Sequence, residues 1–174
     1  MKSVFYFLGT VAVFFLTNTI YISAQSSGTT IRNVVLVHGA FVDGSGWKPV
    51  YDLLVKKGYR VSIVQEPLTS YQEDVRAVLR VVHLQDGPCV LVGHSYGGAI
   101  ITSAGNDQQV EGLVYIAVHA PDDGETEAGN DKLYPAAYKS LKRTSDGFDY
   151  IEPTRFYPDF AADLPASTAL SLQL

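Results

Sequence analysis

Short apolar runs alternate with amphipathic segments through residues 31–118, and this alternation restricts the fold more than any other feature of the sequence. The apolar runs, rich in β-branched residues, are predicted to be strands at 31–37, 60–64, 89–92 and 112–118. The segments between them carry apolar residues at helical spacing and are predicted to be helices at 47–57, from Ser70 onward and at 97–104. Strands separated by helices in this way favour a parallel sheet with crossover helices, and therefore an α/β fold.

The composition excludes several classes of protein. The chain has 174 residues and a net charge of -5, without a run of basic residues, so nucleic acid is not an expected partner. Its single cysteine, Cys89, excludes an internal disulfide and lies within a predicted strand, where a buried apolar role is expected. Histidines and cysteines do not show the spacing of a structural zinc site, and we expect neither a metal nor a cofactor.

Residues 1–24 have the order of a secretory signal peptide. Lys2 supplies a positive start, residues 4–16 are uncharged and apolar, and the segment ends at the small residue Ala24. An uncleaved membrane anchor is the alternative, because residues 4–22 lack any charge. We expect cleavage, export to the periplasm or the medium, and no stable association with the membrane afterwards.

A Gly-x-Ser-x-Gly pattern at Gly93, Ser95 and Gly97 carries the chemistry. It lies between the strand 89–92 and the helix 97–104, which is the context that a nucleophile turn requires. The glycines leave room where side chains would collide, so that the turn raises the serine hydroxyl above the sheet. Ser95 is therefore the predicted catalytic nucleophile, with a serine in an ordinary glycine-rich loop as the alternative.

A serine nucleophile needs donors for the oxyanion that forms when it attacks a carbonyl group. The backbone N–H of Tyr96, at the start of the next helix, is the first predicted donor. The second is expected from the loop after the first strand, and we assign it to the N–H of Ala40. By itself, His38-Gly39 in that loop would be read as an ordinary turn.

The segments 35–47, 66–70, 92–98 and 120–125 resemble the α/β-hydrolase superfamily. More narrowly, they resemble small bacterial hydrolases related to plant methyl-salicylate esterases and hydroxynitrile lyases. The resemblance implies a three-layer fold with a mostly parallel sheet, and a cap inserted after the strand 112–118. The chain is therefore expected to consist of a signal peptide (1–24), a hydrolase core (31–119) and a cap segment (120–174). Within the cap segment, the sequence pattern favours short helices around 135–141 and 156–164 instead of more sheet.

The resemblance also implies hydrolysis of small carboxylic esters or related acyl compounds, with a small-molecule acyl substrate. Phe41 and Trp47 are then expected near the acyl pocket. Two alternatives stay open, because fold and turn do not fix a reaction. One is a lyase or perhydrolase of the same fold, and the other is an inactive remnant or a small-molecule binding module.

The sequence departs from the family in its histidines. The family places the nucleophile first, then the acid and then the histidine, on strands beyond the cap, whereas the last histidine here is His119. We therefore expect either a C-terminally shortened chain, with incomplete activity and an exposed apolar sheet edge, or a protein without the usual triad. Of the four histidines, His119 is the weak candidate for the base. His38 is expected to shape its loop, and His94 is expected to point away from the serine. His83 is expected to lie on the surface or to pack against neighbouring residues.

Overall fold

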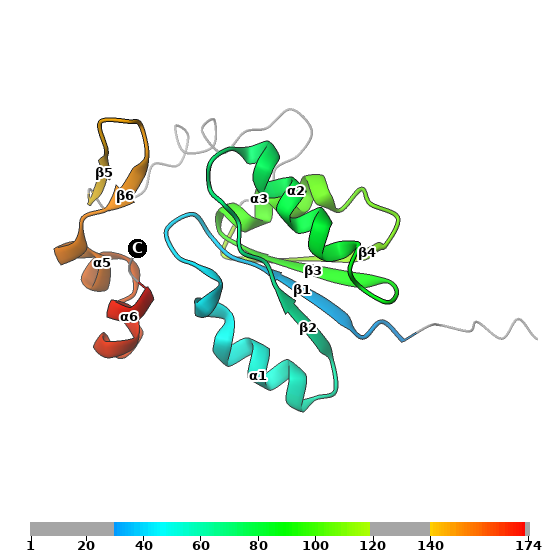
Figure 1. Cartoon of the computed structure of the whole chain (residues 1–174). Helices are drawn as coiled ribbons and strands as arrows, with labels where there is room; N and C mark the ends of the chain where they lie inside the picture. The colour runs from blue at the N-terminus through cyan, green and yellow to red at the C-terminus, as the bar shows by residue number, and fades with distance from the viewer. Residues whose placement is uncertain (1–29, 119–139, 173–174) are drawn as a thin grey trace, which may run out of the picture.

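The computed structural model describes residues 30–118 and 140–172, and its centre is a four-stranded parallel sheet in the order β2-β1-β3-β4 (Figure 1). All of the pairings between neighbouring strands are parallel, which confirms the predicted α/β fold. The strands are β1 (Asn33–Val37), β2 (Arg60–Ile63), β3 (Cys89–His94) and β4 (Val110–Ile116).

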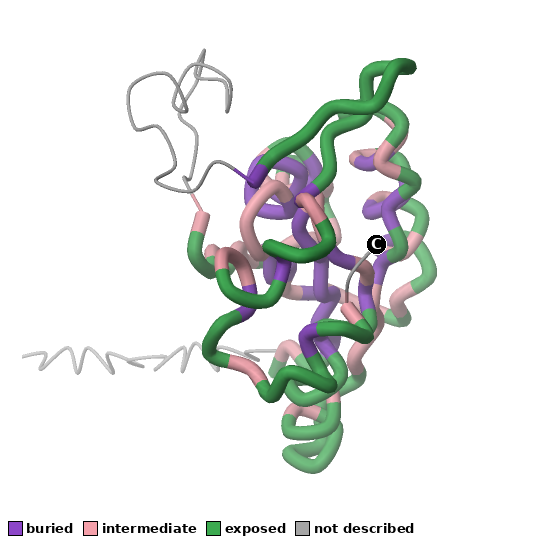
Figure 2. Tube along the Cα trace, turned by 90° about the vertical axis from the view of Figure 1, so that its left-hand side faces the viewer, coloured by how far each residue is buried: buried purple, intermediate pink, exposed green. Residues whose placement is uncertain are grey.

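Helices cover both faces of the sheet and make the three predicted layers (Figure 1). On one face lies α1 (Lys48–Lys56), preceded by the short helix η1 (Gly44–Trp47). On the other face lie α2 (Tyr71–Val82) and α3 (Tyr96–Ala104). The inner strand β1 is buried along its whole length. Figure 2 shows buried residues gathered in the middle of the molecule.

Alternate residues of β1 enter different cores, as the two-residue period of a strand requires. Val35 and Val37 pack with α2 and α3, whereas Val34 and Leu36 pack with Trp47. Burial of both sets explains why the strand reads as a continuous apolar run.

The ends of the helices follow local signals in the sequence. Ser70 caps α2, because its hydroxyl accepts a hydrogen bond from the Glu73 N–H at 3.3 Å. The predicted helix 47–57 begins instead with the tighter turn of η1, and Val50 and Val55 of its expected apolar face are exposed.

The strand predicted at 112–118 runs from Val110 to Ile116, and it forms one edge of the sheet. Val114 and Ile116 on this strand are 44% and 40% exposed. The described residues thus present an apolar edge, which is a site where chains tend to pair and aggregate.

Residues 140–172 lie beside the carboxyl ends of the parallel strands (Figure 1). They form an antiparallel hairpin of β5 (Leu141–Arg143) and β6 (Asp149–Ile151), followed by α5 (Pro153–Phe160) and α6 (Ala166–Leu172). Phe156 and Ala169 of this segment pack with Val42 from the loop after β1.

Two expectations for this segment need correction, and one helix was not anticipated. The helix expected around 135–141 is wrong at its described end, where Leu141 begins a strand, while 135–139 lie outside the described residues. The helix expected at 156–164 starts earlier, at Pro153, because a proline fits the first turn of a helix. The helix α6 was not expected, since the sequence offers little periodicity there.

Among the described residues, no helix combines the length and apolar character needed to cross a membrane. Residues 1–24, for which a signal peptide is predicted, lie outside the described part of the chain.

Candidate active site

Ser95 occupies the turn between β3 and α3, with backbone angles φ 51° and ψ -128°. These angles are unfavourable for a residue with a side chain, and such strain persists only where neighbouring structure holds it in place. The Ser95 N–H donates to the Ile116 carbonyl of β4 at 3.2 Å, and the Ser95 carbonyl accepts from the Gly98 N–H at 2.8 Å. Backbone hydrogen bonds therefore hold the turn to β4 on one side and to the first turn of α3 on the other.

The two glycines of the pattern are required by backbone that lies against them. A Cβ atom on Gly93 would come within 2.6 Å of the Gly97 carbonyl oxygen. A Cβ on Gly97 would lie 2.5 Å from the His38 carbonyl oxygen and 2.7 Å from that of Val37. Neither position can accept a side chain without movement of the backbone, and the close approach of Gly97 brings the end of β1 against the serine turn.

The loop after β1 reaches the serine directly. A Cβ on Gly39 would lie 3.0 Å from Ser95 Cβ and 3.4 Å from Ser95 Oγ. Ala40 follows, and it lines a cavity of about 390 Å³ together with Tyr96 and Phe41. The structure thus brings the two residues predicted to donate to the oxyanion into the lining of one cavity, although Ser95 itself is not among its lining residues.

Tyr96 is held by a buried carboxylate of α2. Its hydroxyl donates to Asp74 Oδ2 at 2.8 Å, and the Leu68 N–H donates to Asp74 Oδ1 at 2.8 Å. Asp74 is only 1% exposed. One side chain therefore ties the loop after β2 to the first residue of α3, a role that the sequence analysis missed because an acidic residue in a helix is usually solvated.

His38 is buried and faces a second buried carboxylate. Its Nδ1 lies 2.8 Å from the Gly39 carbonyl oxygen, and its Nε2 lies 2.9 Å from Glu66 Oε2. Burial alone would lower the pKa of His38, but the Glu66 carboxylate outweighs this effect and raises the pKa above its ordinary value. His38 thus shapes its loop as expected, whereas Glu66, which follows β2, was not identified as its partner.

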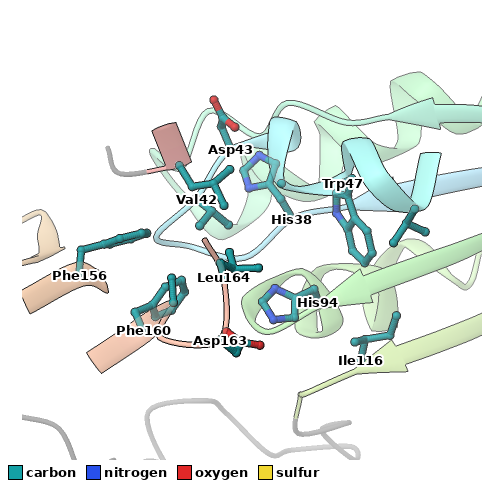
Figure 3. Close-up of a pocket in the computed structure, with 14 residues that line it drawn as sticks. His38, Val42, Asp43, Trp47, His94, Ile116, Phe156, Phe160, Asp163 and Leu164 are labelled. Atoms are coloured by element: carbon teal, nitrogen blue, oxygen red, sulfur yellow. The ribbon is translucent and has the colours of Figure 1, made fainter. Parts of the chain in front are cut away.

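A second cavity, of about 320 Å³, lies between the strand ends and α5 (Figure 3). Trp47 and His94 line it from the sheet side, and Phe156, Phe160 and Leu164 line it from the other side. Phe41 and Trp47 were expected beside one acyl pocket, but they line different cavities. Trp47 packs on the face of the sheet that α1 covers, whereas Phe41 packs with residues of the C-terminal segment.

His94, which was expected to point away from the serine, reaches Gly39 in the loop after β1. Its Nδ1 and Ser95 Oγ both lie 3.4 Å from the point that a Cβ of Gly39 would occupy. The ring meets Trp47 edge-on, with ring centroids 6.3 Å apart, and burial lowers its pKa. A neutral, packed imidazole therefore lies on the same edge of the sheet as Ser95.

The other candidate residues have simpler surroundings. Cys89 is buried in β3, and burial raises the pKa of its thiol, so the unreactive role predicted for it is supported. His83 is exposed at the end of α2 and pairs with Asp107 at 2.7 Å. His119 lies outside the described residues. Within 30–118 and 140–172, no three side chains of the types that bind metals come together.

Known proteins resemble this chain in sequence and in fold. The carbendazim hydrolyzing esterase of Nocardioides sp. is 31% identical over 112 residues, covering 55% of this chain and 46% of that protein. The pyrethroid hydrolase of Sphingobium wenxiniae is 30% identical over 102 residues, covering 50% and 36%. The chain therefore spans less than half the length of these two curated relatives.

A solved structure of tomato methylketone synthase I, complexed with 2-tridecanone, matches with a TM-score of 0.70 and 16% identity. The match covers 83% of this chain and 67% of the tomato chain, and it shows a shared fold. The sequence profile of the alpha/beta hydrolase family matches residues 34–173, which is most of the chain. With the strand order, the strained serine turn and this match in agreement, the chain belongs to the alpha/beta hydrolase family.

Proposed function

We propose that this protein hydrolyses small carboxylic esters with Ser95 as the nucleophile. The observation that carries the proposal is the position of Ser95 on a strained turn at the carboxyl edge of the sheet, against Gly39 of the loop after β1. In parallel sheets the functional groups lie at this edge. Ala40 follows Gly39 and Tyr96 follows Ser95, and both line one cavity, where we place the substrate carbonyl.

In the proposed reaction, Ser95 Oγ bonds to the carbonyl carbon of the ester while its proton passes to a general base. The carbonyl oxygen becomes an oxyanion, and the N–H groups of Ala40 and Tyr96 donate hydrogen bonds to it. When the tetrahedral intermediate collapses, the C–O bond to the alcohol breaks and the alcohol leaves with a proton. Water then attacks the acyl-serine in the same way and releases the carboxylic acid. By analogy with triad chemistry the base is a histidine, for which His119 remains the candidate within this sequence.

The substrate proposed is a small ester with one apolar or aromatic group. The cavity beside Ala40 has a volume of about 390 Å³, and Phe41, Leu68 and Phe148 contribute apolar lining. That volume is at the lower end of the range typical for sites that bind small molecules. The names of the two curated relatives, a carbendazim hydrolyzing esterase and a pyrethroid hydrolase, agree with a substrate of this kind.

Export of the protein is part of the same proposal. The apolar segment after Lys2 and the small residue Ala24 support removal of residues 1–24 on secretion. Amino-terminal sequencing of protein recovered from the producing cells would then start at Gln25, and a chain that retains Met1 would contradict cleavage.

The test of the hydrolase proposal is a rapid-mixing experiment with 4-nitrophenyl acetate. We expect the wild type to release a burst of one equivalent of 4-nitrophenolate per chain, because acylation of Ser95 precedes hydrolysis. Ser95→Ala should abolish the burst. Ser103→Ala is the matched control, since Ser103 is an exposed serine of α3, and it should keep the burst. A wild type that binds the ester without a burst would contradict the proposal and favour a binding module.

A further inference from the structure

We propose that His38 and Glu66 act as a buried pair of positioning residues for the oxyanion hole. Glu66 orients the His38 ring, and the ring fixes the peptide between Gly39 and Ala40, so that the Ala40 N–H is held toward the position of the oxyanion. This inference rests on the proposed function. It gives the oxyanion hole a support that lies outside the nucleophile turn.

The first step is the contact between the ring and the loop. His38 Nδ1 lies 2.8 Å from the Gly39 carbonyl oxygen, which can only accept a hydrogen bond. Nδ1 must therefore carry a proton. The carbonyl carbon of Gly39 and the nitrogen of Ala40 belong to one planar peptide, and this peptide is trans. In such a peptide the C=O and N–H point in opposite directions, so the bond that holds the Gly39 carbonyl also sets the direction of the Ala40 N–H.

The second step is the contact between the ring and Glu66. Nε2 lies 2.9 Å from Glu66 Oε2, and the Glu66 backbone N–H points at the same nitrogen at 3.2 Å. The backbone N–H donates to the neutral ring, and the carboxylate lies at ion-pair distance from the protonated ring. Glu66 therefore provides a partner for Nε2 in either state, while Nδ1 keeps its proton for the loop.

The surroundings favour the charged ring. His38 is 2% exposed and Glu66 is 7% exposed, and Asp43 adds a further negative charge near the imidazole. Among the described residues, neither Glu66 oxygen has a hydrogen-bond partner, and the ion pair with His38 is the polar side-chain contact of Oε2. A buried carboxylate without other donors is costly unless a cation faces it. His38 is the cation that faces this carboxylate, although burial also raises the pKa of the Glu66 carboxyl.

A purely structural role is the alternative, and it predicts different behaviour. A buried ion pair is often no more stabilising than apolar residues of similar volume, so stability alone is weak grounds for one here. The pair also lies where it can affect the reaction, because the next residue, Gly39, packs closely against Ser95, and a Cβ there would lie 3.0 Å from Ser95 Cβ. If the pair positions the oxyanion hole, the reactivity of Ser95 must depend on the Glu66 carboxylate that orients the His38 ring.

The test uses Glu66→Gln in the full chain, with Asp107→Asn as the matched control. Asp107 forms the other described histidine–carboxylate pair, with His83 at 2.7 Å on the surface. The rate at which a fluorophosphonate modifies Ser95 would be measured by mass spectrometry at several pH values. The protonated nitrogen of His38 would be identified by 15N NMR of the ring.

We expect Glu66→Gln to slow the modification of Ser95 by about 10-fold at about pH 8, because a neutral amide holds the His38 ring against the Gly39 carbonyl less firmly than a carboxylate does. The ratio of wild-type to variant rate should approach unity as the pH falls far enough to protonate the Glu66 carboxyl, whose pKa burial raises. A merely structural role would lower stability without this dependence on pH. Asp107→Asn should react at the wild-type rate.

A Glu66→Gln chain that reacts at the wild-type rate at about pH 8 would overturn the inference while leaving the proposed function intact. If the variant does not fold, the wild type decides, because a His38 ring with its proton on Nε2 alone also overturns it. A wild type in which the probe never reaches Ser95 would instead count against the proposed function, and the two failures are thereby distinguished.

Discussion

At the residue scale, backbone strain gathers at one edge of the sheet. In the described part of the chain, Leu68, Ser95 and Ala117 are the non-glycine residues with a positive φ. They follow β2, β3 and β4 respectively, so all of them lie at the carboxyl ends of parallel strands. Strained residues persist where surrounding structure holds them and where function benefits from a fixed geometry. Hydrogen bonds supply that support for Leu68, through Asp74, and for Ser95, through Ile116.

Replacing Gly97 tests the packing of the loop against the nucleophile turn. Gly97→Ala should destabilise the fold by about 1–3 kcal/mol, because the added Cβ would lie 2.5 Å from a backbone oxygen. Gly112→Ala is the control, since its added Cβ meets its nearest neighbour at 3.7 Å, an ordinary contact. Urea denaturation of both variants gives the comparison, and equal stabilities would contradict the proposed close approach.

The hydrogen bond between Tyr96 and Asp74 offers a second test at this scale. Tyr96→Phe removes a donor from a buried carboxylate and should reduce the free energy of unfolding by about 1–3 kcal/mol. Tyr59→Phe changes an exposed tyrosine and should have little effect. If thermal melting shows the same small change in both variants, Asp74 does not depend on the Tyr96 hydroxyl.

At the element scale, helix α2 shows how far local signals reach. Ser70 and the apolar stripe through Val78 and Val82 are visible in the sequence, and the structure confirms both the cap and the burial of these valines. By contrast, the hairpin of β5 and β6 has short, mostly exposed strands, which leave no apolar alternation for the sequence to reveal.

The cap of α2 can be tested directly. Ser70→Ala should lower the free energy of unfolding by about 1 kcal/mol, because the Glu73 N–H loses its acceptor at the first turn of the helix. Gln72→Ala, at an exposed position of the same turn, should leave stability nearly unchanged. Chemical denaturation that ranks the two variants in the opposite order would contradict the capping role.

The candidate site was predictable only in part, and the reason is physical. Gly93, Ser95 and Gly97 lie close together in the sequence, so their pattern reveals the turn. Glu66 and Asp74 are far from their partners in the chain, and only the parallel sheet brings them to His38 and Tyr96. A carboxylate that is buried by tertiary contacts has no local signature. The two separate cavities were also beyond prediction, because they depend on where the C-terminal segment packs.

At the scale of the whole molecule, the buried pair makes stability depend on pH. The pKa of His38 is raised on folding against the effect of burial, mainly by Glu66 and also by Asp43. The folded protein thus holds this proton more tightly, and the resulting stability is fully present below about pH 6.5 and lost as the pH rises through the folded pKa.

In Glu66→Gln the carboxylate is gone, so the main influence that raises the pKa of His38 against the effect of burial is lost. The stability advantage of the wild type over this variant should therefore shrink as the pH rises above about 6.5. Effects of His94, whose pKa is lowered by burial, are common to both proteins and cancel in the comparison. Urea denaturation over a series of pH values measures the advantage, and one that stays constant with pH would contradict an ionised pair.

The central claim is that Ser95 is the reactive nucleophile of the molecule, and covalent labelling tests it most directly. The chain would be treated with a fluorophosphonate, and the modified residue would be located by peptide mass spectrometry. The account predicts a single adduct on the peptide that contains Ser95, and none in Ser95→Ala. An adduct on another residue of the wild type, or labelling that persists in Ser95→Ala, would contradict it.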